Sequence, residues 1–375
     1  MNNPPTAPKH RLHALSAPLL ALLTMLGAGA GAGCTTTDRQ VIGQANQFHE
    51  GLQPAVMNDP ELANYLQKVG DRIIASAEEL DKQGYGPTSH KKENASWMFE
   101  RGGMKFHFVN SKTLNAFTTG GNHMYIYTEL FQQCITEDEL AAVMAHEFAH
   151  VYSRHVQQGT DRQMRTMLAA AGLGAAGYAA GGKQHGAQYG GALAGAAALA
   201  GNYLGMSFTR KDENEADRVG FQFYVHAGWD PAKFDDFFQT MIDKGYDKTP
   251  ESMSDHPSLA SRVQTTKKRV ANLPGEADRW QKPPVAADRE FRQLQARAAQ
   301  VGKTMPTDQS LAGSQELLRA MPRSCLTPRD QEALPDQREA QINVIEALRR
   351  AQQGGRDAAA RPASYSGSGR STYGY

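Results

Sequence analysis

The feature that most constrains this chain is a pair of histidines four residues apart, His146 and His150, with Glu147 directly after the first. Apolar residues recur at helical spacing through residues 136–156, and Thr136 precedes three acids, as in a capped helix start. Side chains at positions i and i+4 project from the same face of a helix. The two imidazoles can therefore share one Zn²⁺, with Glu147 beside the open position of the metal.

A catalytic zinc needs a third protein ligand. The metzincin pattern would place a Gly and a third His where this chain has Ser153 and Val156, so that pattern is excluded. His155 follows His150 by five residues, about 140° further round a continuous helix. We therefore expect His155 to be a structural residue or to lie behind the ligands.

The better source of a third ligand is a later helix, predicted for residues 212–227 and closed by Gly228. Glu213 and Asp217 lie at i and i+4 on this helix, so both can face the histidines. One can bind the metal while the other holds a ligand histidine in its tautomer. The alternative is an acidic, solvated first turn, since Asp212 also suits a helix N-terminus.

Three separated motifs occur in order: H-E-x-x-H at 146–150, E-x-x-A-D-x-x-G at 213–220, and H-P followed by Arg262 at 256–262. Over residues 40–270 this pattern resembles the gluzincin peptidases that include HtpX and the CAAX prenyl proteases. Together with an export signal it is similar to their branch of periplasmic quality-control lipoproteins, which contains BepA and LoiP.

The resemblance implies a zinc metalloendopeptidase with one Zn²⁺ per chain, bound by His146, His150 and Glu213. It implies that Glu147 activates water. For Asp217 it implies either a proton donor or a group that orients a ligand histidine, and we favour orientation from its spacing to Glu213.

The resemblance also implies that Asn115, Ala116 and Phe117 form an edge strand that pairs with extended substrate. The alternative is an ordinary strand of the sheet. It further implies that His256 stabilises an oxyanion or caps the zinc, with Arg262 nearby at the substrate. The alternative for His256 is a helix-start residue before a proline.

The fold class that we predict is α+β and mainly helical, with a zincin-type catalytic domain. A helix is expected from Asp59 to about Leu80. Strands are expected at 105–109, 115–118 and 124–127, as a small antiparallel meander before the metal-site helix.

The N-terminal residues have the pattern of an export signal. Lys9 and Arg11 precede the mostly apolar stretch 14–26, and the small residues 27–33 lead to Cys34. This order resembles a bacterial lipobox and predicts lipidation of Cys34. The alternative is an ordinary signal peptide cleaved nearby.

The predicted segments are a signal peptide at 1–33, a metallopeptidase domain at 34–272, a helical extension at 273–352 and a disordered tail at 353–375. Ala and Gly dominate residues 168–201, which we interpret as a helical hairpin within the catalytic domain. The other interpretation is a mobile or membrane-touching hairpin over the active site.

The formal net charge is +1, and it becomes −1 when residues 1–33 and their two basic side chains are removed. This balance argues against nucleic acid as a partner. The expected partners are polypeptide substrates, a membrane reached through the N-terminal lipid, and outer-membrane assembly components. Thr35 stands where Asp would signal inner-membrane retention, which favours the outer membrane.

The sequence thus predicts a peptidase on the periplasmic side of the envelope that hydrolyses unfolded or misassembled envelope proteins. The rival interpretation is a non-enzymatic chaperone or assembly scaffold with a structural metal site. Besides Cys34 the chain has Cys134 and Cys325, which either pair or are unrelated thiols.

Overall fold

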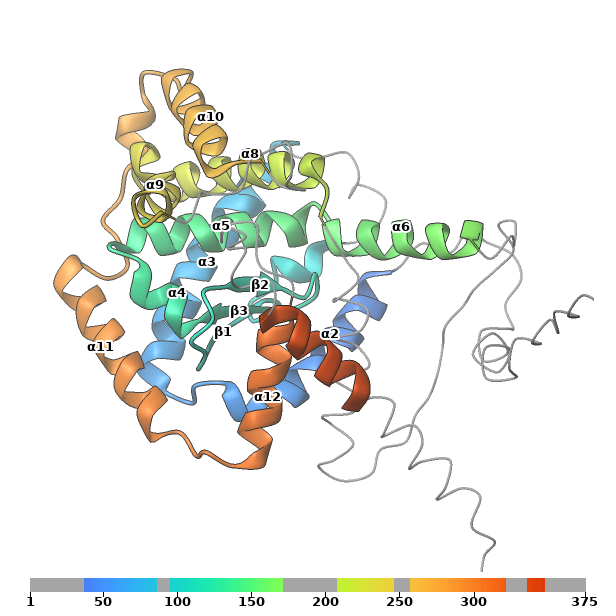
Figure 1. Cartoon of the computed structure of the whole chain (residues 1–375). Helices are drawn as coiled ribbons and strands as arrows, with labels where there is room; N and C mark the ends of the chain where they lie inside the picture. Colours follow the sequence, from blue (N-terminus) through green and yellow to red (C-terminus); the bar gives the residue numbers. More distant parts are fainter. Residues whose placement is uncertain (1–36, 86–94, 171–207, 246–256, 322–335, 348–375) are drawn as a thin grey trace, which may run out of the picture. The chain divides into compact units, whose positions relative to one another are not determined.

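The computed structural model describes residues 37–85, 95–170, 208–245, 257–321 and 336–347. In these residues the chain is mainly helical with one small sheet, as predicted (Figure 1). The α-helices are α2 (Asp38–Leu52), α3 (Pro60–Lys82), α4 (Thr128–Gln133), α5 (Glu137–Tyr152), α6 (His155–Ala170), α8 (Arg210–Ala227), α9 (Asp236–Asp243), α10 (Leu259–Ala271), α11 (Asp288–Thr304) and α12 (Gln309–Ala320). Short 3₁₀ helices are η1 (Gln53–Ala55), η3 (Ala95–Met98), η4 (Pro231–Lys233) and η6 (Ala277–Trp280), and 336–347 is also helical.

The sheet has three strands, β1 (Lys105–Val109), β2 (Ala116–Thr118) and β3 (His123–Tyr127), in the order β1-β3-β2. β2 pairs antiparallel with β3, but β1 pairs parallel with β3. The predicted antiparallel meander is therefore wrong at β1, although the strands themselves were located correctly. β3 is the central strand, and all five of its residues are buried, as expected for a strand covered on both faces.

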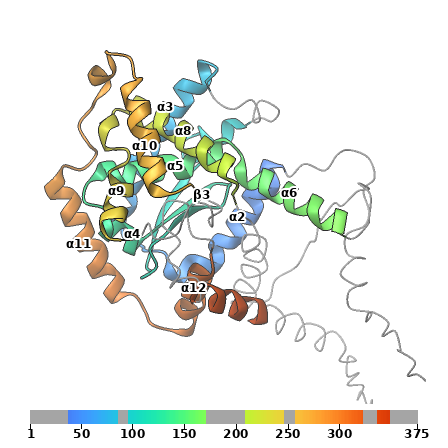
Figure 2. The same cartoon turned by 45° about the horizontal axis from the view of Figure 1, so that its top comes forward.

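Successive side chains along each strand point to opposite sides, so the sheet has two distinct faces. Phe106, Phe108 and Met124 belong to the core that includes α3, α5 and α8. Tyr125 and Tyr127 point the other way, into a second core formed with α2, α12 and the helix 336–347. Figures 1 and 2 show the sheet between α5 on one side and α2 with α12 on the other.

The helices α5 and α8 approach each other closely at Gly220. A Cβ at this position would lie 2.9 Å from the Ala145 carbonyl oxygen and 3.0 Å from the Cα of His146. α8 begins at a capping box between Thr209 and Asp212 and ends at Gly228, whose φ of 99° is left-handed. The glycine of the third-ligand motif therefore lets α8 lie directly against α5.

α5 differs from its prediction at both ends. Thr136 makes no side-chain cap bond, and Glu139 instead accepts from the backbone N–H of Ile135 at 2.9 Å. The helix ends at Tyr152 rather than near Val156. Arg154 adopts a φ of 60° between α5 and α6, held by an ion pair of 2.6 Å to Asp38.

Residues after 272 contribute to the same apolar core as α3 and α5. Glu137, at the start of α5, accepts from the backbone N–H groups of Val285 and Ala286, each at 2.6 Å. Phe291 and Leu294 of α11 are buried in the same apolar cluster as α3 and α5. In the residues that the structure describes, the extension predicted at 273–352 thus packs as part of the same body.

Several predicted segments lie outside the described residues: the signal peptide with Cys34, most of the Ala/Gly-rich hairpin, the C-terminal tail, His256 and Cys325. Cys134 is a buried free thiol, and burial raises its pKa. Among the described helices, none combines the length and apolar character needed to cross a bilayer.

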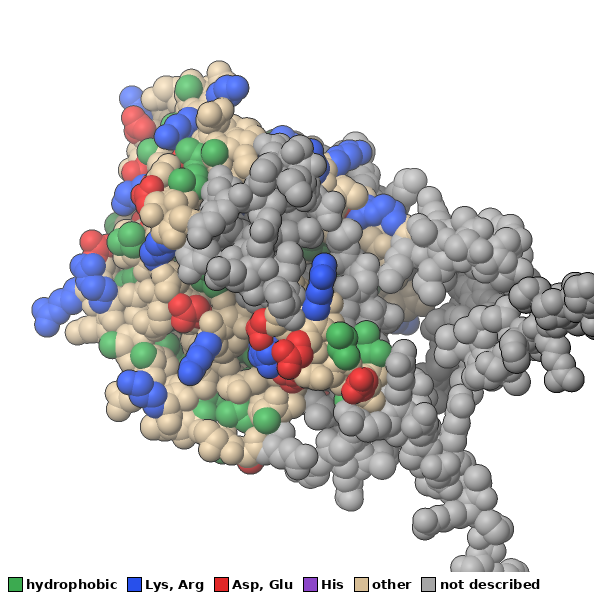
Figure 3. Space-filling model, viewed as in Figure 1, with side chains coloured by type: hydrophobic (Ala, Val, Ile, Leu, Met, Phe, Trp, Pro, Cys, Tyr) green, Lys and Arg blue, Asp and Glu red, His purple; other side chains and the backbone are tan. Residues whose placement is uncertain are grey.

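On the face shown in Figure 3, basic side chains of the described residues lie among acidic and scattered apolar ones.

Candidate functional site

α5 and α8 bring the three predicted metal ligands together. The Nε2 atoms of His146 and His150 lie 3.0 Å apart. The carboxylate of Glu213 lies 3.6 Å from the Nε2 of His146 and 3.8 Å from that of His150. All three side chains are fully buried, and one ligand atom from each lies within 4.8 Å of the other two.

This donor set fits a tetrahedral cation. Zn²⁺ binds imidazole nitrogen and carboxylate oxygen at about 2.0–2.2 Å, which places neighbouring ligand atoms roughly 3.3 Å apart. The three observed separations, 3.0, 3.6 and 3.8 Å, bracket that value. Two imidazoles and one carboxylate also leave a fourth position open for water or substrate, as in catalytic zinc sites.

A charged pair orients His146 from behind. Asp217 accepts from the Nδ1 of His146 at 2.9 Å, so the Nε2 lone pair faces the other ligands. Arg262 in turn donates two bonds to Asp217, the one from Nε measuring 2.9 Å. Burial opposes ionisation of Asp217, but Arg262 and His146 outweigh it and hold the pKa of that carboxyl well below its usual range.

Burial also lowers the pKa of His146 to about 4, although Asp217 opposes the shift. The ring is therefore neutral at pH 7, the form that binds metal.

Arg262 does not lie at an open substrate face, which differs from the predicted substrate contact. Its side chain is buried, and its guanidinium lies 4.2 Å over the ring of Phe238 as well as against Asp217. It bonds Asp217, the hydrogen-bond partner of His146.

His155 orients the other histidine. Its Nδ1 lies 3.0 Å from the Nδ1 of His150, and its Nε2 lies 3.2 Å from Glu215. The bond from His155 lowers the pKa of Glu215. On a continuous helix His155 would point away from His150, but the break at Arg154 turns it back. The pairing of His155 with Glu215 was not predicted, because the φ of a single residue leaves no signal in the sequence.

The remaining predicted residues lie as follows. Glu147 is buried on α5 next to His146. Ala116 and Phe117 belong to β2, an edge strand of the sheet that lies against α5, and Asn115 directly precedes it. The ring of Phe117 packs on Phe48 and Tyr125, on the side of α2.

Comparison with known proteins identifies a family that the chain matches. The model of the family described as Peptidase family M48 matches residues 62–270, more than half of the chain. The matched segment contains the H-E-x-x-H helix, the Glu213 motif and Arg262.

Three relatives illustrate the range of similarity. The chain is 28% identical over 259 residues to the beta-barrel assembly-enhancing protease of Yersinia pestis, covering 68% of this chain and 49% of the relative. The corresponding protein of Escherichia coli (strain K12) is 29% identical over 257 residues, covering 67% and 48%. The mitochondrial metalloendopeptidase OMA1 of Arabidopsis thaliana is 24% identical over 206 residues, covering 55% and 38%. The chain thus spans about half the length of the curated relatives it matches.

Proposed function

The chain belongs to peptidase family M48, and we propose that it is a zinc-dependent endopeptidase of the bacterial cell envelope. The observation that carries the proposal is the convergence of His146, His150 and Glu213 from two helices, with Asp217 behind the first. These residues would hold one Zn²⁺, with Asp217 as an orienting group.

A Zn²⁺ bound there supplies Lewis-acid activation of water and of the scissile carbonyl. Glu147 is the general base in this proposal: it takes the proton of the attacking water and passes it to the leaving amine. A structural zinc site would need no such neighbouring carboxylate, which favours an enzyme over a metal-stabilised scaffold.

Substrate would bind as an extended chain along β2. This strand is at the edge of the sheet and lies beside α5, the helix that carries Glu147. Backbone pairing at such an edge selects for extended conformation rather than for particular side chains. Unfolded or misassembled polypeptides are the substrate class that meets this requirement.

The envelope location rests on two independent features. The N-terminal residues resemble a lipoprotein signal ending at Cys34, and two similar proteins are named for assembly of β-barrels. We propose lipid anchoring through Cys34 at the outer membrane, with envelope proteins as substrates and outer-membrane assembly components as partners.

The test is casein degradation by the purified full-length chain after chelation and after reloading with Zn²⁺. Hydrolysis should require reloading, and Glu147→Gln should retain the zinc while losing at least about 100-fold in rate. Glu139→Gln is the matched control, because Glu139 is a buried acid on the same helix whose pKa is raised by burial. A Glu147→Gln protein as active as the Glu139→Gln protein would contradict the proposal. If the zinc-loaded wild type only prevented client aggregation, the chaperone interpretation would replace it.

A further inference from the structure

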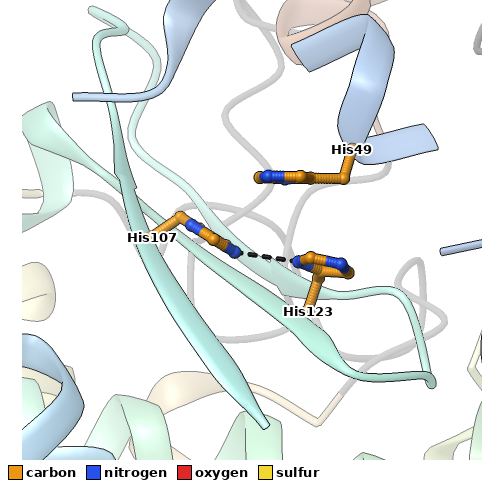
Figure 4. Close-up of side chains that lie close together, drawn as sticks. All are labelled: His49, His107 and His123. Carbon is orange, nitrogen blue, oxygen red and sulfur yellow. Dashed lines mark hydrogen bonds between the residues drawn. The ribbon is translucent and has the colours of Figure 1, made fainter. Parts of the chain in front are cut away.

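Three other histidines lie together on the face of the sheet that α2 covers (Figure 4). They are His49 of α2, His107 of β1 and His123 of β3. One nitrogen from each ring lies within 4.8 Å of the other two. The ring centroids are 4.2 Å apart for His49 and His123, 4.4 Å for His49 and His107, and 5.1 Å for His107 and His123.

The parallel pairing of β1 with β3 creates this cluster. In the register of the two strands, His107 lies opposite Tyr125. Tyr125 is two residues after His123 on β3, so the side chains of His107, Tyr125 and His123 lie on the same face of the sheet. His49 reaches down from α2. Asn46 lies three residues before it on the same helix, and Gln53 lies four residues after it, at the start of η1.

Neighbouring groups hydrogen-bond to these rings and fix their orientation. Histidines that bind metals are usually oriented in the same way. Asn46 accepts through Oδ1 from the Nε2 of His123 at 2.9 Å, which leaves the Nδ1 of His123 as the lone pair. That Nδ1 faces the Nε2 of His107 at 2.8 Å. The Nδ1 of His49 is hydrogen-bonded to the hydroxyl of Tyr125 at 2.9 Å.

The cluster is also accessible from solvent. His123 is buried, but His49 and His107 are only partly covered. His107 lines a cavity of about 330 Å³ together with Val56, Asn58 and Asp59. His107 therefore borders open space at the surface.

Burial is the main cause that lowers the pKa of His49 to about 4, of His107 to about 3 and of His123 to about 2. Lys105, two residues before His107, also disfavours a proton there and equally opposes a bound cation.

We propose that His49, His107 and His123 form a second metal site, which takes one divalent transition-metal cation of the kind that imidazole ligands prefer, Zn²⁺ among them. The ion would join α2 to both β1 and β3 and so fasten the first described helix to the sheet. Binding requires the nitrogens of His107 and His123 to separate from 2.8 Å to roughly 3.3 Å. The ring of His49, stacked at 15° on that of His123, must also turn its Nε2 inward and displace the amide of Gln53.

The experiment counts zinc in the full-length chain by mass spectrometry. The protein is stripped with chelator, dialysed against Zn²⁺ and returned to metal-free buffer. Wild type should retain two ions per chain, and His107→Asn should retain one. His226→Asn is the matched control, since His226 is a partly buried histidine stacked on Trp280 and outside both clusters. It should retain two.

A second background separates this site from the peptidase proposal. The double variant His146→Asn/His150→Asn should keep one ion, and adding His107→Asn to it should remove that ion. In the double variant, Zn²⁺ at a hundred times its Kd should raise the Tm by about 5–10 °C. If His107→Asn does not fold, His49→Gln on the partly exposed face of α2 replaces it.

One ion in the wild type and none in the double variant would overturn the second site while leaving the peptidase proposal intact. Loss of the second ion in His226→Asn would also overturn the assignment, because the ion would then lie elsewhere.

Discussion

The two histidine clusters differ most in the charge that surrounds them. His146 and His150 meet a carboxylate, Glu213, and stand in front of Asp217 and Glu215. The cluster under α2 has uncharged partners instead, the side chains of Asn46, Tyr125 and Gln53, with the cation of Lys105 nearby.

Because of this difference in charge, the two histidine clusters suit different roles. Carboxylates behind and beside imidazoles raise their basicity and offset the charge of a dication, which suits a tightly bound ion. Neutral amide and hydroxyl partners fix ring orientation without that compensation. We therefore expect tighter binding at the α5–α8 site than at the α2 site.

The largest effect should come from removing the charge behind a ligand. Asp217→Asn should lower zinc affinity at the α5–α8 site by about 10–100-fold, because the amide no longer polarises His146. Asn46→Ala removes the neutral partner of His123 and should weaken the α2 site by less. Competition with a chelator of known affinity measures both.

Asp217→Asn also leaves the buried guanidinium of Arg262 without its counter-charge. The double variant Asp217→Asn/Arg262→Gln controls for that loss of stability. Equal losses of affinity in Asp217→Asn and Asn46→Ala would show that charge does not distinguish the two sites.

A smaller effect is expected from disturbing the close packing of α5 against α8. The α5–α8 site requires this packing and the α2 site does not. Gly220→Ala would press a methyl group against Ala145 and His146, and should lower the free energy of unfolding by about 1–3 kcal/mol. Gly43→Ala on α2 is the control, since a Cβ there meets nothing within 4 Å. It should be neutral or stabilise by up to about 1 kcal/mol. Urea unfolding of the metal-free proteins measures both, and a Gly220→Ala protein as stable as Gly43→Ala would refute the packing argument.

A further effect concerns pH and the α2 cluster. The pKa of His107 is about 3 in the folded protein against a usual 6.5, so below pH 6.5 the unfolded chain binds protons that the fold excludes. Stability is therefore full above pH 6.5 and falls as pH drops toward 3, by up to about 1.4 kcal/mol per unit for this residue. In metal-free protein, His107→Asn should flatten this dependence relative to His226→Asn. An unchanged slope in urea unfolding between pH 4 and 6 would contradict the shift.

Short-range patterns in the sequence were enough to predict where many of the helices and strands lie. The helix with His146 and His150, the helix with Glu213 and Asp217, and the positions of all three strands follow from spacings within a few residues. Side-chain direction repeats with the period of the helix or strand, so a local window is enough to assign residues to one face.

The tertiary structure alone decided what depends on distant partners. β1 lies parallel to β3, the central strand of the sheet, and this pairing brings His107 beside His123. The left-handed turn at Arg154 is held by Asp38, more than a hundred residues away in the chain, and it directs His155 onto His150. Such contacts depend on the packing of whole elements, whose energies are summed over the core and are not encoded in any single segment of sequence.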